Sequence, residues 1–158
     1  IQVQEDFETT IDMSINAYIP DKYIQNEYLK LDIYKRIAGI DNPEDYEEML
    51  GELLDRFGEP PKMVQNLLAV ANLKALAHRI YIREVKQMGD QIKLTMHENA
   101  KVDTSKIPEI LSEYPNELQF KVEASPYFIY RPKKKKTKEA VSMMERTEEL
   151  LRKMQCLA

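Results

Sequence analysis

Apolar and polar residues alternate near the start of the chain, over residues 10–17, where the apolar members are Ile11, Met13, Ile15 and Ala17. This period of two predicts a half-buried β-strand, because successive side chains of a strand point to opposite faces. Pro20 would end the strand, since proline cannot donate to a ladder. Residues 1–9 are acidic and have no clean period, so we predict that they form a linker from an upstream domain.

Three helices are predicted next. The first covers about residues 26–38 and carries apolar side chains four residues apart. The second begins near Asn42-Pro43, an N-cap followed by proline, and ends at Gly58. Its predicted apolar face consists of Tyr46, Leu50, Leu53 and Phe57. The third runs from Pro61 to about Arg79 and is apolar around most of its circumference, so we expect it to be the central buried helix.

The pattern after residue 80 favours strands. Residues 81–88 and 91–96 flank Gly89-Asp90, a signal typical of a two-residue hairpin. A short helix at about 105–113 precedes two further strands, at 117–123 and 127–130, and an amphipathic helix at about 138–157 ends the chain. We therefore predict an α+β fold over residues 10–158, as a single domain. In it, an antiparallel sheet of about five strands packs with an N-terminal three-helix segment and a C-terminal helix.

Composition narrows the possible functions. Apolar residues (43%) and charged residues (32%) are close to globular averages. None of the four glycines precedes a lysine, which excludes a phosphate-binding P-loop, and no dinucleotide-binding glycine motif is present. Cys156 is the one cysteine, so an internal disulfide is impossible. No apolar run approaches the ~20 residues of a membrane helix, and we expect a cytoplasmic protein.

The residues able to support catalysis are few. His78 and His97 are the two histidines, and they lack the His-Glu-x-x-His spacing of a zinc site. We interpret His78 as a polar position on the third helix and His97 as the end of a strand. Cys156 lies close to the C-terminus, where excluding water from a nucleophile is difficult. We therefore expect no catalytic residue, no metal site and no cofactor in this chain, and no small-molecule substrate.

Acidic residues gather in one segment, although the net charge of the chain is only −4. Residues 41–60 hold one base, Arg56, and eight acids: Asp41, Glu44, Asp45, Glu47, Glu48, Glu52, Asp55 and Glu59. Several of these acids are spaced by four and three residues, which places them on one helical face. Glu52 and Asp55 lie toward the C-terminal end of the helix, where the helix dipole disfavours acids. Either the face is merely solvated or it docks a basic partner.

A basic run lies later in the chain, where eight residues carry a charge of +6 through Arg131, Lys133, Lys134, Lys135, Lys136 and Lys138. These side chains could contact phosphates, which makes a DNA-contacting accessory domain the alternative function. No aromatic residues interleave them, so base stacking is not supported. A solvated loop before the last helix is the simpler interpretation.

A series of motifs occurs in the order typical of one bacterial family. The motifs are Tyr18-Ile19-Pro20-Asp21-Lys22-Tyr23-Ile24, Leu31, Tyr34-Lys35-Arg36-Ile37-Ala38, Glu52-Leu53-Leu54-Asp55-Arg56-Phe57-Gly58-Glu59-Pro60-Pro61, Asn66-Leu67-Leu68 and Leu73-Lys74. Together they resemble the C-terminal domain of transcription-repair coupling factors. The motifs span about residues 17–80, and the order of the later elements fits to the end of the chain. Tyr81 is a departure, because many relatives carry glycine there, and the lysine run is not part of the family signature.

The resemblance implies a regulatory role rather than a catalytic one. The full-length proteins of the family are ATP-driven translocases on double-stranded DNA that displace stalled RNA polymerase and recruit the repair protein UvrA. Their motor motifs are absent from this chain, so ATP belongs to the parent motor and not to this domain. In the family, the terminal domain packs against the UvrA-binding module of the same protein, masks it and restrains the motor.

The resemblance also favours docking over mere solvation for the acidic face. Glu52, Asp55 and Arg56 fall within the longest motif, and Glu48 lies one turn earlier. We predict that Glu52 and Asp55 pair with arginines of the UvrA-binding module, while Arg56 reaches an acidic or carbonyl group there. Leu53, Leu54 and Phe57 of the same motif are expected to be core residues.

Overall fold

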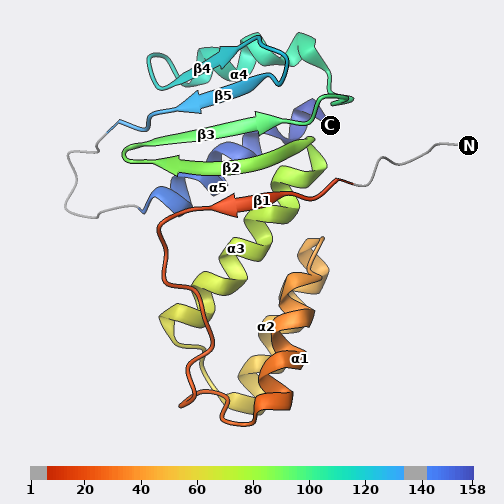
Figure 1. Ribbon diagram of the computed structural model, residues 1–158, viewed down its shortest axis with the longest axis vertical. Coiled ribbons are helices and arrows are strands. Elements are labelled where there is room, and N and C mark those ends of the chain that lie inside the picture. The colour runs from red at the N-terminus through yellow and green to blue at the C-terminus, as the bar shows by residue number, and fades with distance from the viewer. Residues whose placement is uncertain (1–6, 134–141) are drawn as a thin grey trace, which may run out of the picture. The chain divides into compact units, whose positions relative to one another are not determined.

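The computed structural model describes residues 7–133 and 142–158, and the chain divides into two compact units (Figure 1). Unit 1 contains residues 1–13 and 76–158, and unit 2 contains residues 14–75. The chain passes from unit 1 to unit 2 after Met13, and it returns to unit 1 within helix α3 (Lys62–Arg79). Helices and a five-stranded sheet are both present, which confirms the predicted α+β class.

Unit 2 is helical. Helices α1 (Glu27–Ala38) and α2 (Pro43–Phe57) lie side by side and are joined by a short connection (Figure 1). Asn26 and Asn42 are the N-caps, as expected for asparagine at this position. The side chain of Asn26 accepts from the backbone N–H groups of Tyr28 and Leu29, and that of Asn42 accepts from the backbone N–H of Asp45. The three predicted helices are confirmed to within one or two residues at their ends. Their core consists of Ile19, Ile24, Ile33, Ile37, Ile40, Met49, Leu53, Val64, Leu68 and Ala71.

One prediction about α2 is wrong. Leu54 was expected in the core, but 46% of it is exposed. Met49 and Leu53, four residues apart, are the buried pair of this helix, and one residue further on the helix has turned by about 100°. The side chain of Leu54 therefore leaves the core face on which Leu53 lies.

Gly58 ends α2 in a conformation that other residues avoid, with φ 85° and ψ −168°. Its N–H donates to the carbonyl of Leu54, and its carbonyl accepts from the hydroxyl of Tyr23 at 2.9 Å. A Cβ atom here would meet no atom within 4 Å, so the demand for glycine comes from the backbone alone.

We expect Gly58→Ala to reduce the free energy of unfolding by about 1–3 kcal/mol, the cost of holding a non-glycine residue in this region. Urea denaturation followed by circular dichroism measures the loss. Gly51→Ala is the control, since Gly51 lies inside α2 with open space around it, and alanine favours a helix. A loss at Gly51 equal to that at Gly58 would contradict a backbone origin of the effect.

Unit 1 contains a mixed sheet. In chain order the strands are β1 (Thr10–Asp12), β2 (Ile82–Met88), β3 (Gln91–Met96), β4 (Leu118–Lys121) and β5 (Tyr127–Tyr130), and their spatial order is β1-β2-β3-β5-β4. The pairs β2–β3, β3–β5 and β4–β5 are antiparallel as predicted, whereas β1 pairs with β2 in parallel. A parallel pair needs a long connection, which residues 13–81 supply.

The first strand is shorter than its pattern predicts. The alternation of more and less exposed residues continues to residue 18, but β1 ends at Asp12, the last residue registered against β2. Beyond that point the backbone has no ladder partner; instead the carbonyl of Asn16 accepts from the amide of Asn66 at 2.9 Å. Alternating burial therefore extends further than the strand itself.

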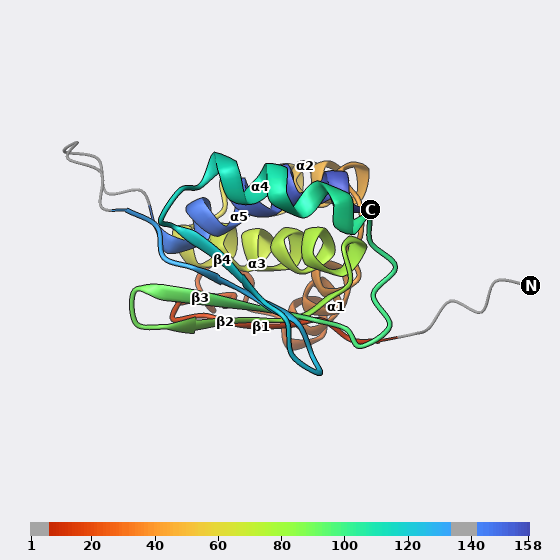
Figure 2. The ribbon, with the colours of Figure 1, turned by 90° about the horizontal axis from the view of Figure 1, so that it is seen from above.

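Two helices of unit 1, α4 (Ile107–Glu113) and α5 (Met143–Met154), lie on the same face of the sheet (Figure 2). Short 3₁₀ turns, η1 (Thr104–Lys106) and η2 (Gln155–Leu157), precede α4 and follow α5. The buried residues of α5 are Met144, Thr147, Leu150, Leu151 and Met154, which confirms its predicted amphipathic face. The start predicted for this helix, at about 138, lies outside the described residues.

The described residues of the predicted linker, 7–9, contact the rest of unit 1 through their side chains. Thr9 is buried and donates from Oγ1 to the carbonyl of Ile82 at 2.8 Å. The ring of Phe7 lies 4.3 Å from that of His78 and 4.7 Å from that of His97. The rings of both histidines thus pack against the ring of Phe7 within this unit.

Tyr81 has a backbone conformation that favours glycine, the residue that the family resemblance led us to expect there. Its φ is 61°, a left-handed conformation that costs little for glycine and more for tyrosine. Its ring stacks on Phe7 at 5.9 Å, a contact that glycine cannot make. The stacking offsets part of the backbone cost.

Candidate functional site

The acids predicted to dock a partner lie on the surface of α2. Glu48, Glu52 and Asp55 are spaced by four and three residues, so they share one side of the helix. Glu48 and Asp55 are exposed, and neither side chain forms a hydrogen bond or an ion pair with any residue in the described ranges. Their carboxylates are therefore available to cationic groups from outside unit 2.

Glu52 is different, because both of its carboxylate oxygens have partners within unit 2. Its Oε1 accepts from Nη2 of Arg36 at 2.8 Å, and its Oε2 accepts from Nη1 of the same guanidinium. Oε2 also accepts from Nη1 of Arg56 at 3.1 Å. Arg36 lies on α1 and Arg56 lies one turn beyond Glu52 on α2, so this carboxylate connects the two helices.

These contacts explain an acid near the C-terminal end of a helix. The hydrogen bond from Arg36 is the largest cause that lowers the pKa of Glu52, and its charge and the guanidinium of Arg56 act in the same direction. The pKa of Arg36 is raised chiefly by the same hydrogen bond. The two guanidiniums thus stabilise a carboxylate that the helix dipole alone would disfavour.

Arg36 is the functional candidate that sequence reasoning missed. It lies 16 residues before Glu52, a separation at which no helical spacing rule connects two side chains. The short connection between the two predicted helices indicates that they form an antiparallel pair. In such a pair an arginine near the end of the first helix can lie beside the second helix, and this was the signal that the sequence offered. Only the packing of α1 on α2 places it against Glu52.

The basic run is described only at its start. The backbone N–H of Arg131 donates to the carbonyl of Glu117 at 2.7 Å, and that of Lys133 donates to Oε1 of Glu117 at 2.9 Å. Glu117 therefore places a carboxylate beside the beginning of the run. Lys134, Lys135, Lys136 and Lys138, predicted as phosphate contacts, lie outside the described residues.

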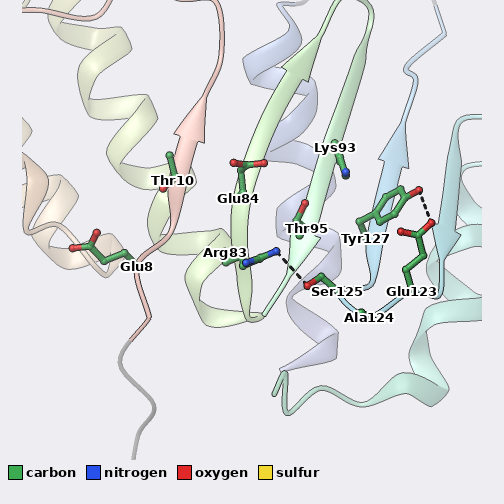
Figure 3. Close-up of a pocket in the computed structure, with 10 residues that line it drawn as sticks. All are labelled: Glu8, Thr10, Arg83, Glu84, Lys93, Thr95, Glu123, Ala124, Ser125 and Tyr127. Carbon is green, nitrogen blue, oxygen red and sulfur yellow. Dashed lines mark hydrogen bonds between the residues drawn. The ribbon is translucent and has the colours of Figure 1, made fainter. Parts of the chain in front are cut away.

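A hollow of about 500 Å³ lies on unit 1, across β1, β2, β3 and β5 (Figure 3). Arg83 points toward Ser125, with its Nη2 3.2 Å from the hydroxyl, and Tyr127 points toward Glu123. The hollow is lined by Glu8, Thr10, Arg83, Glu84, Lys93, Thr95, Glu123, Ala124, Ser125 and Tyr127. The lining residues include three acids and two bases, whose charges nearly cancel, so the hollow favours neither an anionic nor a cationic ligand.

Within residues 7–133 and 142–158, no group of three or more histidine, cysteine, aspartate or glutamate side chains is arranged to hold a metal ion. None of the helices in these ranges is both long enough and apolar enough to cross a membrane.

A family model, the TRCF domain, matches residues 13–107, which contain α1, α2 and α3. The transcription-repair-coupling factor of Bacillus subtilis is 38% identical over 116 residues, covering 72% of this chain and 10% of that protein. This chain belongs to the transcription-repair coupling factor family. The corresponding protein of Rickettsia prowazekii is 30% identical over 129 residues, covering 82% of this chain and 11% of that protein. The chain therefore spans about a tenth of the length of these relatives.

A solved structure, the C-terminal domain of a transcription-repair coupling factor, matches with a TM-score of 0.77 and 26% identity, covering 92% of this chain and 88% of that one. The chain is thus a C-terminal domain of this family, as its motifs predicted. The match to the family model includes Arg36, Glu48, Glu52, Asp55 and Arg56, and it ends before Arg131.

Proposed function

We propose that this chain is a regulatory, non-catalytic domain of a transcription-repair coupling factor. In the proposed mechanism it masks the UvrA-binding module of the same protein and restrains the upstream ATP-dependent DNA translocase. The mask opens when the parent protein engages stalled RNA polymerase, so that UvrA is recruited there. The membership of the family and the match to its C-terminal domain support this assignment.

The observation that carries the proposal is the pair of exposed, unpaired carboxylates, Glu48 and Asp55, on a helix inside the family match. Unit 2 holds seven basic and eleven acidic side chains, so its net charge of −4 equals that of the whole chain. A negative surface of this kind favours a basic partner and raises its rate of association.

A mask must also be able to open. Ion pairs between exposed side chains contribute about 1 kcal/mol or less each, so a few of them favour the closed state only modestly. An equilibrium held by such contacts shifts when a partner binds the open form more tightly. Charged contacts at an exposed helix therefore suit a reversible clamp better than a large apolar interface does.

The test reverses Glu48 and Asp55 to lysine in a full-length transcription-repair coupling factor that carries this domain. We expect UvrA binding and basal ATPase activity both to rise at least threefold, because like charges now face the basic module. UvrA capture and ATP hydrolysis without DNA are the measurements.

A control protein carries Glu47→Lys on another side of α2 and Glu109→Lys on α4, which changes the net charge equally. It should behave as the parent. If the double reversal leaves both readouts unchanged while the protein stays folded, the proposed masking is wrong. If the control rises as much as the test protein, net charge rather than this face is responsible.

A further inference from the structure

The ring of Phe7 lies among the rings of His78, Tyr81 and His97 in unit 1. Its centroid is 4.3 Å from that of His78, 5.9 Å from that of Tyr81 and 4.7 Å from that of His97. The N–H of Tyr81 donates to the carbonyl of His78 at 3.1 Å, and the N–H of His97 donates to the carbonyl of Tyr81 at 2.7 Å. His78, Tyr81 and His97 thus form an aromatic cage held by their own backbones, and Phe7 enters it from a distant part of the sequence.

Tyr81 contributes to the aromatic cage at a cost. Its φ of 61° strains a tyrosine, whereas glycine would adopt the same conformation freely. Glycine would also give Phe7 no ring to stack on at this position. Strained conformations persist where the surrounding structure holds them in place, and they often mark residues with a specific task. The strain at Tyr81 therefore favours a specific role for the cage in holding Phe7.

Thr9 is a second anchor, two residues after Phe7. Its Oγ1 donates to the carbonyl of Ile82 at 2.8 Å and lies 3.2 Å from Nδ1 of His78, which belongs to the aromatic cage. The residue is buried, so its hydroxyl needs these partners, because an unsatisfied buried polar group is costly. Phe7 and Thr9 are therefore held at one place, where α3 ends and β2 begins.

The strand that follows these anchors is held weakly. β1 lies at the edge of the sheet, where three of its residues are registered against β2 (Figure 1). Thr10 and Asp12 are exposed and Ile11 is only partly buried, so the strand buries little apolar surface. Segments of this kind open at a lower free energy than the core of a protein. The attachment of residues 7–12 to unit 1 thus depends largely on Phe7 and Thr9.

We infer that residues 7–12 form a releasable strap, which the aromatic cage anchors through Phe7 and which leaves unit 1 without unfolding it. The chain passes to unit 2 after Met13 and returns within α3, so after release the chain joins unit 2 to residues 76–158 through α3. In a full-length factor the rest of the protein would join this domain through residues before Phe7, so a movement there acts on the strap first. The strap does not depend on the proposed masking.

Amide hydrogen exchange of this chain, followed by NMR, tests the inference. Phe7→Ala empties the cage, and we expect the protected amides of β1 to exchange about tenfold faster or more, while those of β3 and β5 stay within about threefold of the parent chain. An equal acceleration across the sheet, or complete unfolding, would show that the strap and the sheet are one cooperative unit. That result, or unchanged exchange in β1, overturns the inference.

Tyr81→Gly separates the hold on the strap from the stability of the whole chain. It removes a ring of the cage but relieves the positive φ, so exchange in β1 should rise about threefold or more while the urea midpoint does not fall. Tyr81→Phe keeps the ring and should match the parent chain. If Tyr81→Gly leaves exchange in β1 unchanged, the cage does not hold the strap.

Phe120→Ala is the matched control, because it makes the same truncation on β4, the strand at the opposite edge of the sheet. We expect it to speed exchange at β4 and to leave exchange at β1 unchanged. If it accelerates β1 as much as Phe7→Ala does, general weakening of the sheet explains the effect, and the strap is not a separate unit.

Discussion

Replacing Leu53 by alanine is expected to reduce the free energy of unfolding by about 2–5 kcal/mol, the usual cost of emptying a leucine site in a packed core. Leu53 is fully buried and belongs to the same core cluster as Ile33, Ile37 and Leu68. It lies between Glu52 and Asp55 on α2, so this side chain anchors the helix that carries the predicted docking residues. Urea denaturation followed by circular dichroism measures the effect.

Leu54→Ala is the matched control, because it removes the same atoms from the next residue. With 46% of Leu54 exposed, we expect a loss below about 1 kcal/mol. Equal losses at the two positions would contradict the burial that the structure assigns to them. The comparison also tests the correction to the sequence prediction, which placed both leucines in the core.

Phe128→Ala is expected to have a comparable effect in unit 1, a loss of about 3–5 kcal/mol. Phe128 is fully buried on β5, where it is registered against Leu94 of β3 and Phe120 of β4. Its ring lies 4.6 Å from that of Phe120, so alanine also removes an aromatic contact. Faster hydrogen exchange at the amides of β3 and β5 would locate the weakening in this sheet.

Ile129→Ala is the control for that substitution. Ile129 follows Phe128 on β5, so its side chain points to the opposite face of the sheet, and it is only partly buried. We expect a smaller loss, about 1 kcal/mol, mainly from the lower strand preference of alanine. A loss at Ile129 as large as that at Phe128 would show that the core does not lie on the face of Phe128.

The predictions that succeeded rest on local signals. Asn26 and Asn42 are the N-caps of α1 and α2, where the sequence predicted the two helices to start. Gly89-Asp90 forms the predicted two-residue connection between β2 and β3. Caps, turns and periodicity act over a few residues, so a sequence displays them directly. The motifs predicted the family of the chain, and the family model and the relatives confirmed that prediction.

The failures concern pairings between distant parts of the chain. The alternation over residues 10–17 predicts alternating burial, but a strand exists only where β2 supplies a ladder, at Thr10–Asp12. Leu54 has an apolar side chain typical of a core residue. It is exposed only because its position around the axis of α2 turns it away from the core.

The same distinction applies to the predicted docking face of α2, which carries Glu48, Glu52 and Asp55. By itself the sequence determined that the acids of α2 share one side of a helix and that Glu52, Asp55 and Arg56 lie in a family motif. Only the tertiary structure decided that Glu52 is bound by Arg36 and Arg56, while Glu48 and Asp55 are left unpaired. The physical reason is that helical spacing fixes which residues of one helix are neighbours, whereas an ion pair between two helices depends on how their faces pack.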